Sequence, residues 1–146
     1  TKMPGTVASL VTTIFIYIAY EYLGYTDLRF SIIFFFIIFF YSFYAVRDSE
    51  SEFVNKDPRQ IVIDEVLGQS MPLILLLHLN QTNQISMQIE IYYIISFFVF
   101  RFFDIFKPFP VSYFDKNFKN YFGIIMDDIM AGFYTMLVIY LISLKF

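Results

Sequence analysis

Two long apolar segments without a charged side chain constrain the fold of this chain more than any other feature. They cover residues 30–46 and 129–144. At about 1.5 Å per residue, a helix of this length nearly crosses the ~30 Å hydrocarbon core of a bilayer. Hydrophobic residues make up 58% of the 146 residues, above the roughly 45–50% usual in soluble domains. A small soluble domain has too little interior to bury this excess, so the sequence predicts a membrane-embedded protein.

Three further apolar segments predict helices, although each is short or carries charged residues near an end. They cover residues 7–23, 61–79 and 89–106. The segments between them are polar or charged, and residues 107–120 contain Pro108 and Pro110, which stop a helix. The length leaves room for one domain only. We therefore predict an all-α fold, in which residues 1–146 form a single compact, membrane-embedded bundle of about five main helices.

Charged residues are distributed unevenly between the two ends of these five helices. With a cytoplasmic N-terminus, the basic residues on the cytoplasmic side are Lys2, Arg47, Lys56, Arg59, Arg101, Lys107, Lys116 and Lys119, and only Arg29 and Lys145 lie on the other side. This distribution follows the positive-inside rule. The same threading places six carboxylates at the cytoplasmic ends of helices, namely Asp57, Asp64, Glu65, Asp104, Asp127 and Asp128. The sequence therefore predicts one acidic, partly basic cluster at the cytoplasmic face.

The composition of this cluster favours a hard divalent cation. Carboxylates at close range repel each other, and one of a pair keeps its proton unless a cation intervenes. The chain has no Cys and a single His, so the available ligands are oxygens, which favour Mg²⁺ or Mn²⁺ over zinc or copper. The basic residues among the acids are those that a phosphate group needs, and they are Arg59, Arg101, Lys107 and Lys2. The predicted reaction class is metal-assisted phosphoryl transfer with water as the nucleophile.

Two local patterns add detail to the predicted site. Residues 4–10 form a helix-start signal in which Thr6 is the expected N-cap, and a helix N-terminus at this surface would attract a phosphate. Gly68 shares a helix face with the carboxylates at Asp64 and Glu65, so a neighbouring helix is expected to approach closely there.

Other interpretations of the charged residues stay open. The carboxylates could form interhelical ion pairs and helix caps, and Arg101 with Asp104 could be a simple intrahelical pair. A small cation channel, transporter or assembly subunit would also carry acidic residues, distributed at several depths along a pore. A net charge of −3 without basic runs argues against nucleic-acid binding. No feature indicates an obligatory protein partner.

Several segments resemble the phosphatidylglycerophosphatase A family. They read KMPGTVASL over residues 2–10, KDPRQIVIDEVLG over 56–68, and FRFFDIFKPFP over 100–110 followed by GIIMDDIMAG over 123–132. Ala8 stands where the family usually has Gly. The resemblance covers nearly the whole chain. It implies an all-helical fold and Mg²⁺-dependent hydrolysis of the phosphomonoester of phosphatidylglycerophosphate to phosphatidylglycerol, and we expect this activity at the cytoplasmic face of the bacterial inner membrane.

The resemblance also implies a set of site residues. The acidic members are Asp64, Glu65, Asp104, Asp127 and Asp128, and the phosphate partners are Arg101 and Lys107. We expect the Mg²⁺ ligands to be Asp64 and Glu65 with one or both of Asp127 and Asp128, and Asp104 to be a further ligand or the general base. A phosphatase for another phospholipid head group stays an alternative, because the sequence does not locate the contacts that would recognise glycerol.

Overall fold

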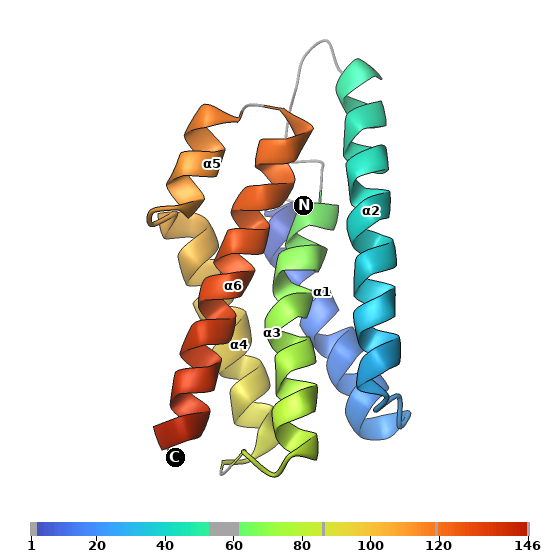
Figure 1. Cartoon of the computed structure of the whole chain (residues 1–146), viewed down its shortest axis with the longest axis vertical. Helices are drawn as coiled ribbons and strands as arrows, with labels where there is room; N and C mark the ends of the chain where they lie inside the picture. Colours follow the sequence, from blue (N-terminus) through green and yellow to red (C-terminus); the bar gives the residue numbers. More distant parts are fainter. Residues whose placement is uncertain (1–2, 53–61, 86, 119, 146) are drawn as a thin grey trace.

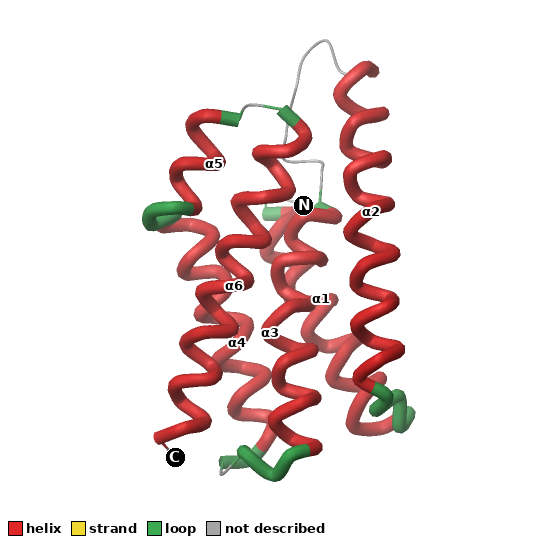
Figure 2. Tube along the Cα trace, viewed as in Figure 1, coloured by secondary structure: helices red, strands yellow, loops and turns green. Residues whose placement is uncertain are grey.

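The computed structural model describes residues 3–52, 62–85, 87–118 and 120–145. In this part of the chain there are six α-helices, one π-helical turn and no strand. They are α1 (Pro4–Tyr17), η1 (Ile18–Tyr22), α2 (Leu28–Glu52), α3 (Ile63–Gln81), α4 (Ile89–Phe106), α5 (Val111–Asn117) and α6 (Tyr121–Lys145). The long helices run up and down in one bundle (Figures 1 and 2). As a result, the starts of α1, α3 and α6 lie toward the same end as the end of α4.

The all-α prediction is confirmed, and the number of helices is corrected. The extra helix, α5, occupies a segment that was expected to separate two helices. Pro110 takes the N-cap position of α5, where the missing N–H of proline removes no helical hydrogen bond. The prediction that Thr6 caps the first helix is wrong, because α1 begins at Pro4 with Met3 in the cap position. Proline suits the first position of a helix because its φ is already fixed at a helical value.

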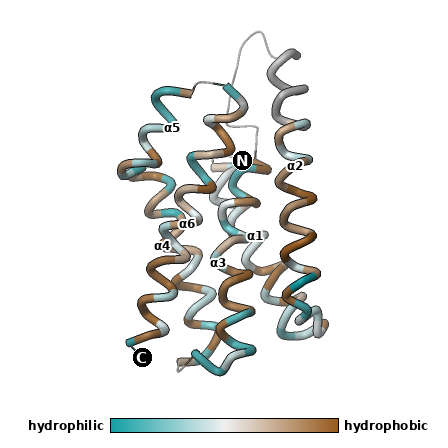
Figure 3. Tube along the Cα trace, in the orientation of Figure 1, coloured by the Kyte–Doolittle hydropathy of each residue, from teal (hydrophilic) through white to brown (hydrophobic). Residues whose placement is uncertain are grey.

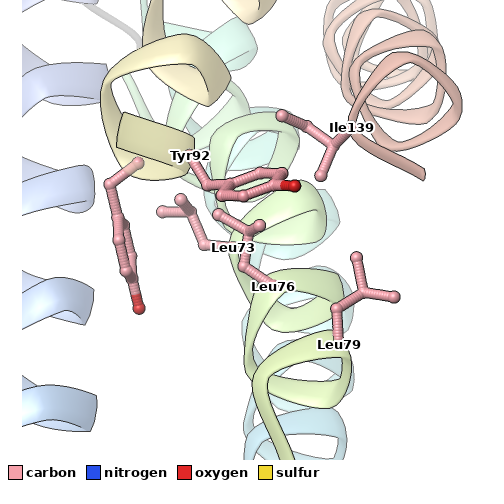
Figure 4. Close-up of a cluster of buried hydrophobic side chains, with 6 residues drawn as sticks. Leu73, Leu76, Leu79, Tyr92 and Ile139 are labelled. Atoms are coloured by element: carbon pink, nitrogen blue, oxygen red, sulfur yellow. The ribbon is translucent and has the colours of Figure 1, made fainter. Parts of the chain in front are cut away.

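The apolar core lies around α3, which packs against α1, α2, α4 and α6. Its largest cluster includes Leu73, Leu76 and Leu79 of α3 together with Tyr92 of α4 and Ile139 of α6. Figure 4 shows the Tyr92 ring lying between the α3 leucines and Ile139. The three leucines recur every three residues along α3, so one stripe of this helix is fully buried. This core holds the helices whose ends carry the charged residues.

Within the described ranges, two helices are long and apolar enough to cross a membrane. The qualifying windows are Leu28–Ala45 in α2 and Phe122–Lys145 in α6, with mean hydropathies of 1.9 and 1.6. Only 6% of the α2 window is buried inside the bundle, against 39% of the α6 window. Figure 3 shows that α2 is hydrophobic along much of its length. The two segments agree with the two best spans predicted from the sequence, and their insertion into lipid stays a prediction.

Helices α3 and α6 approach each other closely at two glycines. A Cβ atom on Gly68 would lie 2.5 Å from the backbone oxygen of Asp128 and 2.6 Å from Cε2 of Phe100. A Cβ atom on Gly132 would collide with the backbone oxygen of Gly68. The close approach predicted at Gly68 is thus confirmed, and α6 is the helix that makes it. This contact brings the first turn of α3 beside Asp128.

Candidate active site

Three carboxylates meet where α3 begins and α6 passes it. Asp64 and Glu65 lie in the first turn of α3, and Asp128 lies about two turns into α6. Carboxylate oxygens of the three residues lie within 4.8 Å of one another. Asp64 is 7% exposed and Asp128 is 4% exposed. We call this group the carboxylate triad, and its spacing suits three ligands that share one cation.

The electrostatics of the triad also favour a cation. Burial raises the pKa of Asp64 well above its ordinary value, and the hydrogen bond and negative charge of Glu65 raise it further. Oε2 of Glu65 is buried and has no hydrogen-bond partner within the described residues. Leaving a buried carboxylate oxygen unpaired costs free energy. A divalent cation would supply the missing partner, and a ligand set made only of carboxylate oxygens fits Mg²⁺.

The start of α1 lies directly against Glu65. A Cβ atom on Gly5 would collide with Oε1 of Glu65, so only glycine fits at this position without moving the carboxylate. Thr6 follows in the same turn and is half-buried. The first turn of a helix carries N–H groups without intrahelical acceptors, and these attract anions. Gly5 thus brings the first turn of α1, which includes Thr6, to the carboxylate triad, and a role of Thr6 near a phosphate stays a prediction.

Arg101, near the end of α4, has a buried donor without an acceptor among the described residues. Its Nη1 forms an ion pair with Oδ2 of Asp104 at 2.6 Å and donates a hydrogen bond to Oγ of Ser9 at 3.4 Å. Its Nε is buried and finds no acceptor in the described part of the chain. The intrahelical ion pair of Arg101 with Asp104, which the sequence left open as an alternative, is thus present, and the role of Arg101 toward a phosphate stays a prediction. The unused Nε–H is a donor that a phosphate oxygen could accept.

Lys107 joins two carboxylates from different helices. It ends α4 in the left-handed conformation, with φ 44° and ψ 58°. Its Nζ donates to Oδ2 of Asp127 at 2.7 Å and to Oδ1 of Asp115 at 2.5 Å. Burial lowers the pKa of Lys107, but the hydrogen bonds and charges of Asp115 and Asp127 outweigh it and raise this pKa. Asp127 therefore pairs with an ammonium group in this structure, whereas Asp128 belongs to the triad.

Most of the predicted site residues lie in the described part of the chain, where they form three groups. The structure brings together the triad, the pair of Arg101 with Asp104, and the pair of Lys107 with Asp127. Lys2, Asp57 and Arg59 lie outside the described residues. The sequence analysis missed Asp115, which lies on the unexpected helix α5. Its signal was the start of a helix at Pro110 followed by phenylalanines at positions 114, 118 and 122, which recur at helical spacing.

A comparison with known protein families finds one that matches nearly the whole chain. The family described as phosphatidylglycerophosphatase A matches residues 1–143. The chain belongs to this family. The resemblance seen in the sequence motifs is thereby confirmed, and the triad, Arg101 and Lys107 all fall inside the matched range.

Curated relatives of the phosphatidylglycerophosphatase A family match parts of the chain. A phosphatidylglycerophosphatase A of Haemophilus influenzae is 50% identical over 48 residues, which are 33% of this chain and 29% of the relative. The Escherichia coli protein of the same name is 40% identical over 48 residues, or 33% and 28%. A putative phosphatidylinositol-3-phosphatase of Bacteroides thetaiotaomicron is 36% identical over 84 residues, or 58% and 48%. The matched segments thus span less than half of each relative. No solved structure matches the chain.

Proposed function

We propose that this protein is a Mg²⁺-dependent lipid phosphatase that hydrolyses the phosphomonoester of phosphatidylglycerophosphate to phosphatidylglycerol and phosphate. Its family and the names of two relatives support this reaction. The observation that carries the proposal is the triad of Asp64, Glu65 and Asp128, in which Asp64 and Asp128 are buried and the carboxylate oxygens lie within 4.8 Å of one another. Lys107 pairs with Asp127, the neighbour of Asp128, and Arg101 supplies a second basic side chain near the end of α4. Such a combination of carboxylates and cations matches the needs of a phosphoryl group and its metal ion.

The proposed Mg²⁺ ligands are Asp64, Glu65 and Asp128. The unpaired Oε2 of Glu65 and the absence of nitrogen or sulfur ligands in this group support a hard cation. When bound, the cation would supply positive charge that stabilises the negative charge on the phosphoryl oxygens. Asp127, also expected as a ligand, is hydrogen-bonded by Lys107 instead. We therefore assign it to holding that lysine.

The remaining charged residues would act on the phosphate and on water. Arg101 would bind a phosphate oxygen through its unused Nε–H, and Lys107 through its third N–H. A water molecule attacks phosphorus and loses a proton to Asp104, which Arg101 orients. The bond between phosphorus and the glycerol oxygen breaks, and that oxygen takes up a proton to give the free hydroxyl. Removing Asp104 should therefore slow the chemical step more than it weakens substrate binding.

The same proposal places the protein in the bacterial inner membrane with its N-terminus and active site on the cytoplasmic side. The exposed apolar face of α2 supports contact with lipid, since Phe30 is 74% and Phe40 is 68% exposed. The bias of basic residues toward the end that carries the site supports the orientation. The acyl chains of the substrate would stay in lipid, while the head group reaches the triad at the surface.

A second candidate substrate is a phosphoinositide with a monoester phosphate. The Bacteroides relative named as a putative phosphatidylinositol-3-phosphatase covers a larger part of this chain than the other two relatives do. The triad and the two basic residues would serve either lipid, because both present a phosphomonoester. A cation channel is favoured less, because the described site carboxylates gather at one end of the bundle and not along a pore.

The deciding experiment measures phosphate release by the purified protein in detergent micelles, with Mg²⁺ or with a chelator. The substrates are phosphatidylglycerophosphate, phosphatidylinositol 3-phosphate and phosphatidic acid. We expect Mg²⁺-dependent release that is fastest with phosphatidylglycerophosphate. Losing a residue that only holds a metal ligand in place already costs about 10- to 100-fold in metal affinity or activity. Asp64→Asn changes a proposed ligand itself, so its activity should fall by more than about 100-fold. The matched control is Asp27→Asn, an exposed Asp in the turn before α2. Near-normal activity of Asp64→Asn, or release without Mg²⁺, would refute the proposal.

A further inference from the structure

Asp115 reaches the proposed active site although the reaction described above does not use it. Its Oδ1 accepts a hydrogen bond from Nζ of Lys107 at 2.5 Å, while the same Nζ donates to Asp127 at 2.7 Å. The side chains of Asp115, Lys107 and Asp127 are 43%, 30% and 10% exposed. The ammonium group of Lys107 therefore lies between one carboxylate near the surface and one that is almost buried.

Packing against α6 fixes the helix that carries Asp115. Val111 at the start of α5 is fully buried. The ring of Phe114 stacks on Phe118, and Phe118 makes an edge contact with Phe122 of α6. The hydroxyl of Tyr134 on α6 also donates to the backbone oxygen of Phe109 at 2.7 Å, just before α5. Asp115 is thus held by an anchored helix, which makes it suitable for fixing the position of another group.

Two fixed acceptors determine the direction of the third donor of a lysine. An ammonium group has three N–H bonds in tetrahedral directions and no acceptor. Two of those of Lys107 are directed to Asp115 and Asp127, so the direction of the third follows. A lysine without such partners is a flexible point charge, and it must lose side-chain freedom each time that it binds a phosphate. Holding it in advance reduces this loss.

We propose that Asp115 is a positioning residue, which acts with Asp127 to hold the Lys107 ammonium where its third N–H meets the phosphate of the substrate. The inference rests on the proposed phosphatase function and names a residue that the family resemblance did not include. The left-handed backbone of Lys107 is part of this arrangement. It turns the chain from α4 toward α5, so that residues 107 and 115 can meet across the turn.

The expected effect of removing Asp115 is modest and specific. Partly exposed ion pairs are worth about 0.2–1 kcal/mol, or roughly 1.4- to 5-fold in binding. Asp115→Asn should therefore raise KM about two- to fivefold and leave kcat within about twofold, because Asp115 does not touch the reacting atoms. Asp115→Glu keeps the charge and should recover most of the loss. Asp27→Asn removes an exposed Asp from the turn before α2 and is the matched control. Helix α2 begins at the end of the bundle opposite to the start of α3 (Figure 1).

A double-mutant cycle with Lys107→Met tests whether Asp115 acts through that lysine. If it does, the double variant should be no worse than Lys107→Met alone, whereas independent structural roles would add. A parallel titration of inorganic phosphate into the protein in micelles measures binding without turnover. Thermal unfolding of each variant checks that the bundle is intact.

The outcomes separate this inference from the proposed function. A wild-type protein that binds phosphate but releases none from any lipid would overturn the phosphatase proposal, and the phosphate titration would still test Asp115. An active wild type whose KM and phosphate affinity do not change in Asp115→Asn would overturn the role of Asp115. A lower KM in that variant would overturn it too, because Asp115 would then compete with phosphate for the ammonium. Additive effects of Asp115→Asn and Lys107→Met in the double-mutant cycle would show that Asp115 does not act through Lys107, and would also overturn its proposed role.

Discussion

Adding one methyl group at Gly68 tests whether the contact between α3 and α6 sets the geometry of the triad. In Gly68→Ala the new Cβ would lie 2.5 Å from the backbone oxygen of Asp128. Ordinary contact begins at 3.4 Å, so α6 must move away by about 0.9 Å. Asp128 is itself a member of the triad, and Asp64 precedes Gly68 by one helical turn. The substitution therefore separates two proposed ligands directly.

The cost should appear in activity more than in stability. Overpacking of a core costs about 1–3 kcal/mol, but alanine gains about 1 kcal/mol over glycine in a helix interior. The net loss of stability is then about 0–2 kcal/mol. A displacement of about 1 Å at a catalytic site can cost about 100-fold in rate. We expect Gly68→Ala to fold and to lose roughly 10- to 100-fold in kcat/KM, with weaker Mg²⁺ affinity.

The assay is Mg²⁺-dependent phosphate release in micelles, with denaturant unfolding of the same preparation. The matched control is Gly24→Ala, in a turn where a Cβ meets nothing within 4 Å but the backbone φ is 70°. That change should cost stability through backbone strain and leave the triad in place. If Gly68→Ala keeps wild-type kcat/KM and Mg²⁺ affinity, the contact does not determine the site and the reasoning fails.

Two further predictions concern the charged residues. Arg101→Lys should lower kcat/KM about 10- to 100-fold. The reason is that lysine lacks the Nε–H, and a charge-assisted hydrogen bond contributes about 1.5–3 kcal/mol. An unchanged kcat/KM would show that Arg101 does not bind the phosphate. The second prediction concerns pH. A raised pKa of Asp64 means that the folded metal-free protein binds more protons than the unfolded chain does, so its stability should fall as pH rises above the ordinary Asp value. Mg²⁺ replaces that proton and should reverse the trend, which unfolding curves near pH 5 and near pH 8, with Mg²⁺ or chelator, would show. Equal pH dependence in both conditions would contradict it.

The main helices were predictable because their apolar segments have clear limits. The segment 89–106 begins after polar residues and ends before Pro108, and α4 has the same bounds. The start of α6 was harder to place, because Asp127 and Asp128 interrupt the apolar pattern and the helix continues through them from Tyr121. Charged residues end an apolar segment without ending a helix when each of them finds a partner or a shared site.

The short helix α5 was not predictable by the same reasoning. Pro108 and Pro110 predict a helix stop, which is correct for α4, but a proline also suits the start of the next helix. The helix that follows has only seven residues. The phenylalanines at 114, 118 and 122 recur at helical spacing but continue beyond its end, so they indicate a helix without marking its bounds. The contact of Asp115 with Lys107 depends on how α5 packs on α6, which spacing along the chain does not reveal.

The alternating direction of the predicted helices was enough to place the carboxylates at one end of the bundle. Their division into the triad and the pair with Lys107 is seen only in the structure. Asp127 and Asp128 are neighbours in sequence, and successive residues on a helix point about 100° apart. Their side chains therefore leave the helix in different directions. Asp128 faces the first turn of α3, and Asp127 faces Lys107. The sequence shows that Asp127 and Asp128 point in different directions, but it does not show which of them points to α3 and which to Lys107.

That division has a consequence for the proposed reaction. Since Asp127 and Asp128 are adjacent on α6, a cation held by the triad and the ammonium of Lys107 would be held from consecutive positions of one rigid helix. A phosphate that contacts both must then lie beside this turn of α6, with Arg101 reaching it from α4. The distance between the two positive groups would depend on the backbone of α6 and not on loop motion. Substitutions that shift α6 as a unit, such as Gly68→Ala, should therefore weaken Mg²⁺ and phosphate binding together, whereas Asp115→Asn should weaken phosphate binding alone.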